Sequence, residues 1–241
     1  MDTTLNGTIG RPVRIPLRDE AELRGNLAIP EAARGIVIFA HGSGSSRLSP
    51  RNQYVARVLG EAGLGTLLVD LLTEAEEQED ELTGGLRFDI GFLTSRLVDT
   101  IHWVMRSEEA RELPIGLFGA STGAAAALAA SAMECREVRA VVSRGGRPDL
   151  AGRVLALVSA PTLLIVGGDD VQVLALNRDA YARLRCERRL TVVPAATHLF
   201  EEPGALEAVA RHASEWFTQH LAPPPSERAG TRELRAQPRS A

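Results

Sequence analysis

The chain has 241 residues, of which 44% are apolar and 24% charged, as is typical of a globular protein. Its formal net charge is −4, and no basic face of the kind that binds nucleic acids is visible. All 27 basic residues are arginine, which excludes a Schiff-base lysine, a Ser-Lys dyad and the lysine-dependent phosphate-binding loop.

The predicted elements begin with two stretches, 13–17 and 23–29, that alternate polar and apolar residues as half-buried strands do. They predict an antiparallel hairpin at one edge of a sheet. Buried strands then alternate with amphipathic helices. Strands are expected at 35–40, 66–70, 115–118, 140–142, 162–166 and 190–193, and helices at 51–61, 90–106, 122–133, 173–184 and 206–220. This alternation implies parallel pairing with helices on both faces, a three-layer α/β domain.

Two segments depart from the alternation. Residues 71–88 include six acids in the eight residues from Glu74 to Glu81, and predict a solvated acidic loop or a short helix. The alternative is a mobile cover over a site. The segment 223–241 has four prolines, four arginines and almost no large apolar residue, so we expect it to be disordered or loosely packed. We therefore expect one domain over residues 1–222, followed by a C-terminal tail.

Targeting signals and metal ligands are not evident. The first residues, Met1–Thr4, lack the basic and apolar regions of a signal peptide, and no run approaches the ~18 apolar residues of a membrane span. Cys135 and Cys186 form no C-x-x-C pair that would hold zinc. We expect a cytoplasmic protein with no membrane partner and no metal site.

The pentapeptide Gly119–Gly123 has the pattern Gly-x-Ser-x-Gly between a buried strand and a helix of small residues. A sharp turn there presents Ser121 as a nucleophile and leaves no room for side chains at the two flanking glycines. The amide of Thr122, at the start of the helix, can stabilise an oxyanion. The alternative is tight packing with Ser121 as a helix N-cap. A dinucleotide-binding loop is disfavoured, because the glycines do not follow G-x-G-x-x-G.

A second loop, His41-Gly42-Ser43-Gly44, follows the buried strand 35–40. Its glycine-rich turn can aim a backbone N–H at the oxygen that the Ser121 turn addresses, with Ser43 as the first choice of donor and Gly44 as the next. The alternative is a simple turn in which His41 packs and forms hydrogen bonds.

A nucleophilic serine needs a base and a group that orients the base. His198 follows the last predicted strand, where it can reach the carboxyl edge of the sheet. Asp169 and Asp170 follow the preceding strand, and spacing alone does not separate them. The chain order serine, aspartate, histidine is the one expected for hydrolases built on such a sheet.

These motifs resemble the α/β-hydrolase superfamily, most closely its dienelactone-hydrolase-like branch, over roughly Leu23 to Leu221. In that family the acid precedes x-x-Val in a stretch like 167–173, which favours Asp170. The resemblance implies hydrolysis of an ester, lactone or related acyl bond without a metal or organic cofactor. Ser121 stands where dienelactone hydrolases carry cysteine, so the nucleophile looks more like that of the general carboxylesterases.

Several residues near these loops are candidates for substrate binding: His41, Gly42, Gly44, Arg47, Arg51, Arg87 and Arg144. Arginines on loops at the carboxyl ends of the strands can bind an anionic substrate. The alternative is that they pair with the acidic stretches Glu74–Glu81 and Glu201–Glu202.

The prediction is thus a serine hydrolase with Ser121 as nucleophile, His198 as base and Asp170 as the orienting acid. The amides of Ser43 and Thr122 would form the oxyanion hole. An acyltransferase or perhydrolase would use the same residues, and a non-catalytic hydrolase-fold binding module is the alternative outside enzymes. The expected partner is a small-molecule ester or lactone; the substrate's identity and the oligomeric state stay open.

Overall fold

A computed structural model describes residues 4–5, 8–18 and 21–222 of the chain. Its strands are β1 (Thr4–Leu5), β2 (Thr8–Ile9), β3 (Arg11–Pro16), β4 (Glu22–Ala28), β5 (Ile36–Ala40), β6 (Gly65–Val69), β7 (Ile115–Ala120), β8 (Val138–Arg144), β9 (Thr162–Gly167) and β10 (Arg188–Val193). Its α-helices are α1 (Pro50–Glu61), α2 (Glu74–Thr83), α3 (Ile90–Arg106), α4 (Thr122–Met133), α5 (Val171–Arg183) and α6 (Ala205–His220). Two 3₁₀ segments are η1 (Leu86–Phe88) and η2 (Pro148–Leu157).

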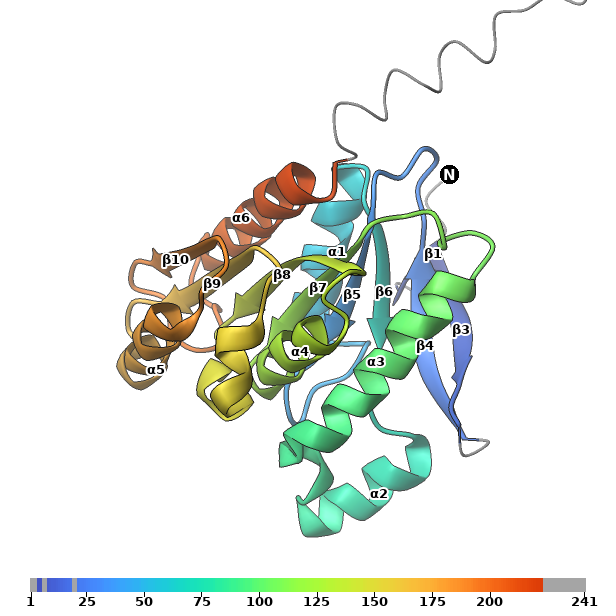
Figure 1. Ribbon diagram of the computed structural model, residues 1–241, viewed down its shortest axis with the longest axis horizontal. Helices are drawn as coiled ribbons and strands as arrows, with labels where there is room; N and C mark the ends of the chain where they lie inside the picture. Colours follow the sequence, from blue (N-terminus) through green and yellow to red (C-terminus); the bar gives the residue numbers. More distant parts are fainter. Residues whose placement is uncertain (1–3, 6–7, 19–20, 223–241) are drawn as a thin grey trace, which may run out of the picture.

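The main sheet of the described residues has eight strands in the order β10-β9-β8-β7-β5-β6-β4-β3 (Figure 1). Neighbours from β10 to β6 in this order are parallel, so their carboxyl ends meet at one edge. The strands β4 and β3 pair antiparallel and close the other side of the sheet. This confirms the predicted mostly parallel sheet with an antiparallel edge hairpin.

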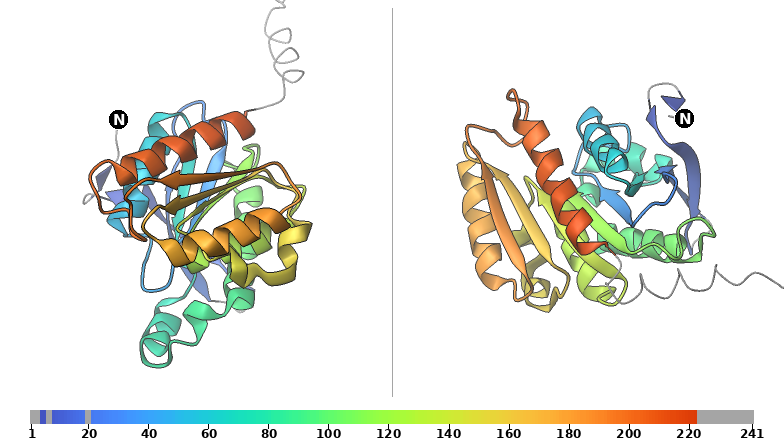
Figure 2. Two further views of the ribbon diagram at one scale, coloured as in Figure 1. Left: turned by 90° about the vertical axis from the view of Figure 1, so that its left-hand side faces the viewer. Right: turned by 90° about the horizontal axis from the view of Figure 1, so that it is seen from above.

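Helices cover both faces of the sheet, and Figure 2 shows α6 and α5 on opposite sides of the strands. Apolar side chains of α1 and α6 pack on one face, around Phe39, Phe118 and Trp216. Those of α3, α4 and α5 pack on the other face, around Ile38 and Leu117. The central strands β5 and β7 are buried throughout, which explains their apolar sequences. The predicted three-layer α/β fold is therefore confirmed.

Helix α4 lies unusually close to the sheet because its first turns consist of small residues. A Cβ atom placed on Gly123 would lie 2.3 Å from the carbonyl oxygen of Ala40 and 2.5 Å from that of His41. Most residues of α4 are buried, including the run Ala124–Ala127. The alanine-rich sequence thus serves close approach of a helix backbone to the ends of β5 and β7.

Two segments outside the regular alternation are now defined. The acidic segment forms α2, a short helix as one of its two expected forms, and its Thr73 side chain and Glu76 make a reciprocal capping box. The η2 segment was not expected, because its short turns are interrupted at Gly152, where φ is +59°. The tail at 223–241 lies outside the described residues, and its looseness stays a prediction. Among the helices described, none has both the length and the apolar character to cross a membrane.

We predict that Gly123→Ala destabilises the fold, because the added methyl group would meet backbone atoms that cannot move without shifting β5. Overpacking of this kind costs about 1–3 kcal/mol, a fall in Tm of roughly 2–4 °C per kcal/mol for a domain of this size. Gly60→Ala in α1 is the control, since a Cβ there meets nothing within 4 Å. We expect it to raise stability by about 0.5–1 kcal/mol. Equal melting temperatures for the two variants would contradict the packing argument.

Candidate active site

Ser121 occupies a strained turn between β7 and α4. Its φ is +50° and its ψ is −121°, a conformation that non-glycine residues rarely adopt. Three hydrogen bonds hold the backbone there: the Ser121 N–H donates to the carbonyl of Arg144 at 3.2 Å, and the Ser121 carbonyl accepts from the N–H groups of Ala124 at 3.1 Å and Arg147 at 3.0 Å. The turn leaves the Ser121 side chain half-buried at the carboxyl edge of the sheet.

The 41–46 loop packs directly against this turn. A Cβ atom on Gly42 would lie 2.8 Å from the Cβ of Ser121, so glycine is required at this approach. The N–H of Ser43 donates a hydrogen bond to the Thr122 hydroxyl at 3.0 Å. The two predicted oxyanion donors are therefore neighbours, but the Ser43 amide already has a protein acceptor. Thr122 begins α4, and the first N–H groups of a helix lack partners within the helix.

His41 has a structural environment. Its Nε2 accepts the N–H of Leu71 at 3.3 Å, so Nδ1 carries the proton and donates to the Gly42 carbonyl at 3.1 Å. The side chain is only 10% exposed. Burial lowers the pKa of His41, against the opposing effects of the Gly42 hydrogen bond and the Asp70 carboxylate. The neutral His41 ring therefore links the 41–46 loop to the backbone of Leu71.

His198 and Asp170 are in direct contact. His198 Nδ1 lies 2.6 Å from Asp170 Oδ2, and because a carboxylate only accepts, Nδ1 is the donor. In the neutral ring this leaves Nε2 free to accept a proton. The Asp170 side chain is 13% exposed, whereas Asp169 is exposed, so of the two adjacent aspartates Asp170 is the one that contacts His198.

Backbone contacts bring the two loops together. The N–H of Gly168 donates to the carbonyl of Val193 at 2.8 Å, and the N–H of Asp169 donates to that of Ala196 at 3.0 Å. A Cβ on Gly167 would lie 2.2 Å from the Ala196 carbonyl oxygen, which explains glycine at the end of β9. The loop that carries the acid is therefore fixed against the loop that carries His198.

The Ser121 turn and the His198 loop both contact the end of β8. The residue after Arg144 is Gly145, whose hypothetical Cβ would lie 3.6 Å from the His198 ring and 3.1 Å from its carbonyl. Within the described residues, no hydrogen bond joins the Ser121 hydroxyl to the His198 ring. Such contacts are often long in unliganded enzymes and tighten with substrate.

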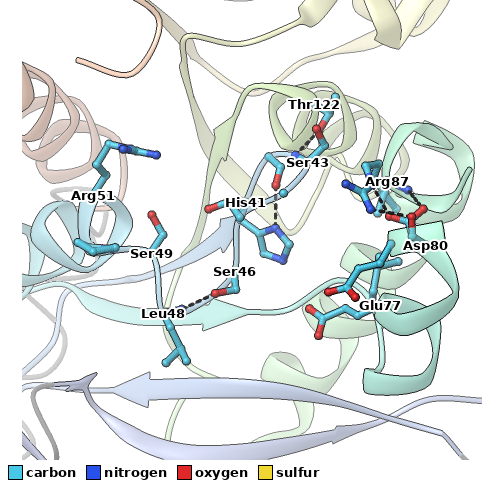
Figure 3. A pocket seen from close by; sticks show the side chains of 17 residues that line it. His41, Ser43, Ser46, Leu48, Ser49, Arg51, Glu77, Asp80, Arg87 and Thr122 are labelled. Carbon is cyan, nitrogen blue, oxygen red and sulfur yellow. Dashed lines mark hydrogen bonds and ion pairs between the residues drawn. The ribbon is translucent and has the colours of Figure 1, made fainter. Parts of the chain in front are cut away.

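A cavity of about 530 Å³ opens beside the 41–46 loop (Figure 3). Thr122 contributes to its wall, but Ser121 and His198 are not among the lining residues. Helix α2 and η1 form the opposite wall with Glu77, Asp80 and Arg87. The segment for which a mobile cover was the alternative is thus helical and lies beside the cavity, and its mobility and a role as a cover stay hypotheses.

The segment is tied down by arginine–carboxylate contacts. Asp80 is 2% exposed and accepts the N–H of Leu86 at 2.7 Å, besides a side-chain bond from Arg87 Nε. These backbone and guanidinium hydrogen bonds keep the pKa of Asp80 below its usual value, even though desolvation acts in the opposite direction. Arg96 pairs with Glu76 at 2.5 Å. Sequence reasoning did not single out Asp80, because nothing in an acidic run marks which carboxylate is buried.

The candidate substrate-binding arginines differ in their hydrogen-bond and ion-pair partners. Arg47 is bonded through its backbone and guanidinium to the buried Asp70 and through Nε to Asn26, so we do not assign it to substrate. Arg87 pairs with Asp80 and Arg51 with Glu201. Pairing with these acidic stretches is the expected alternative to substrate binding. Arg144 has no hydrogen bond or ion pair to its guanidinium in the described part of the chain. Gly42 and Gly44 line the cavity, and Gly44 has a positive φ.

The comparisons with known proteins show two kinds of relative. No family model matches the chain. Two Mycobacterium tuberculosis proteins (strains CDC 1551 / Oshkosh and ATCC 25618 / H37Rv), whose name proposes phosphoribosyl transferase activity, are each 55% identical over 226 residues, 90% of this chain. That match covers 50% of each protein. The chain therefore spans about half the length of the curated relatives it matches.

Solved structures show the same fold. A dienelactone hydrolase from Anabaena variabilis is 58% identical, with a TM-score of 0.86 over 88% of this chain and 97% of that one. Est1E from Butyrivibrio proteoclasticus is 16% identical, with a TM-score of 0.73 over 87% of this chain and 98% of that one. The second likeness shows a shared fold alone.

We predict that His41 makes stability depend on pH. Its pKa is lowered in the folded protein, so the unfolded chain binds more protons there, and stability is lost as the pH falls below the ordinary histidine value. His41→Gln keeps an acceptor for the Leu71 N–H but does not titrate. Between pH 7 and pH 5, the wild type should lose stability faster than this variant, by at most about 1.4 kcal/mol per pH unit. Urea unfolding at several pH values gives the two curves; parallel curves would contradict a buried neutral His41.

Proposed function

The chain belongs to the dienelactone hydrolase family of the α/β-hydrolase fold, and on this basis we propose that it is a serine hydrolase of ester, lactone or related acyl bonds. The observation that carries the proposal is the 2.6 Å hydrogen bond between His198 and Asp170 at the edge of the sheet where the strained Ser121 turn lies. Of the relatives, the Anabaena protein is named a hydrolase. The Mycobacterium proteins are named as proposed phosphoribosyl transferases, and only half of their length matches this chain.

In the proposed reaction, Ser121 Oγ attacks the carbonyl carbon while His198 Nε2 takes the hydroxyl proton. The tetrahedral intermediate collapses, the bond to the leaving group breaks, and that group takes the proton from Nε2. Water then attacks the acyl-enzyme with the same histidine as base, which releases the acid and restores Ser121. Asp170 holds the ring with Nδ1–H toward itself and stabilises the imidazolium in both steps.

The oxyanion would be bound by the N–H groups of Thr122 and Ser43. Because the Ser43 N–H donates to the Thr122 hydroxyl, it must exchange this acceptor for the substrate oxygen. The Thr122 hydroxyl thus keeps the amide close to its working position without leaving it unsatisfied. No step in this scheme requires a metal or an organic cofactor.

The substrate is proposed to be a small molecule. The cavity beside the 41–46 loop has a volume of about 530 Å³, in the range of small-ligand sites. One esterase with the same fold, Est1E, was solved with ferulic acid bound, which supports a small carboxylic ester as the class to test first. Acyl transfer and perhydrolysis differ only in the molecule that attacks the acyl-enzyme, so product analysis separates them from hydrolysis.

Ser121→Ala is expected to reduce hydrolysis of short 4-nitrophenyl esters by about 10⁴- to 10⁶-fold, because no other side chain replaces the attacking oxygen. A fluorophosphonate probe should label the wild type and not this variant. Ser95→Ala changes an exposed serine on α3 and is the control for both measurements. Activity within tenfold of the wild type in Ser121→Ala, with unchanged melting, would exclude Ser121 as nucleophile. A wild type that neither labels nor turns over any ester would favour the binding-module alternative.

The adjacent aspartates provide a matched pair for the orienting role. Asp170→Asn should lower kcat on the order of 10⁴-fold, since the amide cannot hold the required histidine tautomer. Asp169→Asn changes an exposed side chain and should leave kcat within about threefold. Steady-state kinetics and probe-labelling rates of both variants decide between them. The assignment is wrong if Asp169→Asn is the impaired enzyme.

A further inference from the structure

Arg144 is a buried cation beside the candidate nucleophile, and its guanidinium has no partner within the described part of the chain. The residue is 8% exposed, and its Nε and Nη1 atoms are buried with no hydrogen-bond acceptor among the described residues. Its carbonyl accepts the Ser121 N–H, so its main chain is part of the turn that presents the serine. A buried guanidinium without acceptors is costly, because the lost hydration is not replaced.

The strand alternation shows on which face its side chain lies. Ala140 and Val142 pack in the apolar cluster of α1 and α6, and Arg144 follows them on the same face of β8. Helix α1 brings Arg51 to this face, and the Arg51 charge, after burial, lowers the pKa of Arg144 to about 10. The charged group that acts on the pKa of Arg144 is therefore a second cation.

Neither Glu201 nor the start of α1 neutralises this pair. Arg51 contacts Glu201 at 3.1 Å, but their side chains are 33% and 64% exposed, and solvent screens such pairs. The Arg51 Nε atom is also buried without an acceptor. Helix α1 has no acidic residue in its first turn and no side-chain cap, so its N-terminus adds positive potential.

We propose that Arg144 and Arg51 form a subsite for a phosphate group of the substrate, next to the bond that Ser121 attacks. The inference rests on the proposed hydrolase function and names its substrate class: a phosphorylated ester or lactone. Three buried nitrogens on two guanidinium groups lack acceptors among residues 4–5, 8–18 and 21–222, and a phosphate monoester offers three terminal oxygens with a charge of about −1.5 to −2. A carboxylate offers two oxygens and one charge.

Three aryl acetates test the proposal: 4-acetoxyphenyl phosphate, 4-acetoxybenzoate and the neutral phenyl acetate. For each enzyme, kcat/KM for a charged ester is divided by kcat/KM for phenyl acetate; for 4-acetoxyphenyl phosphate we call this quotient the phosphate ratio. Comparing the quotients of variant and wild type cancels the intrinsic reactivity of the esters. Arg144→Met should lower the phosphate ratio by about 10- to 100-fold, as expected when charge-assisted hydrogen bonds are lost. Arg51→Met, at a more exposed site, should lower it by roughly 3- to 10-fold.

Arg57→Met is the matched control, because Arg57 lies on α1 but pairs with Glu61 at 2.7 Å on the exposed surface. Its phosphate ratio should equal that of the wild type. The melting temperature of Arg144→Met should be equal or higher, since removing an unpaired buried charge relieves its desolvation. A lower melting temperature together with an unchanged phosphate ratio would show a structural role and overturn the proposal. An equal loss on 4-acetoxybenzoate would overturn the assignment to phosphate.

Calorimetric titration of inorganic phosphate into Ser121→Ala measures the subsite without turnover. Phosphate should bind at least tenfold more weakly when Arg144→Met is added to Ser121→Ala. If the two proteins bind phosphate equally while Ser121→Ala is inactive, the subsite is wrong and the hydrolase proposal stands. If Ser121→Ala keeps its activity, the hydrolase proposal is wrong, and the titration still shows whether Arg144 binds phosphate.

Discussion

Contact between the backbone of α4 and the end of β5 determines the geometry of the site. Gly123 lies against the carbonyls of Ala40 and His41 at a distance that admits no Cβ, and a Cβ on Gly42 would also be too close to Ser121, at 2.8 Å. With the chain leaving β7 and entering α4 in so little space, Ser121 takes a positive φ. The strain is thus imposed by packing of main chain on main chain, and the alanine-rich helix is the sequence feature that permits it.

The end of β8 then links the parts that the proposals use. The carbonyl of Arg144 accepts the Ser121 N–H, and Gly145 lies beside His198, where a Cβ would be 3.1 Å from the His198 carbonyl oxygen. The side chain of Arg144 extends from the same point toward α1. One strand terminus therefore positions the candidate nucleophile, the candidate base and the candidate anion subsite, so a substrate held by that arginine would lie beside the other two.

The arginines near the site differ in whether they pair with a carboxylate. Arg47, Arg87 and Arg96 each contact a carboxylate, and through these contacts the 41–46 loop and α2 are held in place. Guanidinium suits this role because its planar fork can bond two groups at once. Arg144 is about as buried as Arg96, but its guanidinium has no carboxylate partner among the described residues, and on this difference rests the proposal that it binds a ligand.

The sequence by itself determined the α/β architecture, the hairpin at the edge, the turn at Ser121 and the loops that carry His198 and the two aspartates. These depend on periodicity and glycine spacing, which are local along the chain. Only the tertiary structure decided that the Ser43 amide bonds to Thr122 and that, within the described residues, Arg144 alone among the candidate arginines has no side-chain partner. It also decided that Asp170, which spacing left level with Asp169 and the family resemblance favoured, is the aspartate that contacts His198. Those outcomes depend on which side chains meet across the edge of the sheet, between residues as far apart as Arg51 and Glu201, and no local pattern encodes such a meeting.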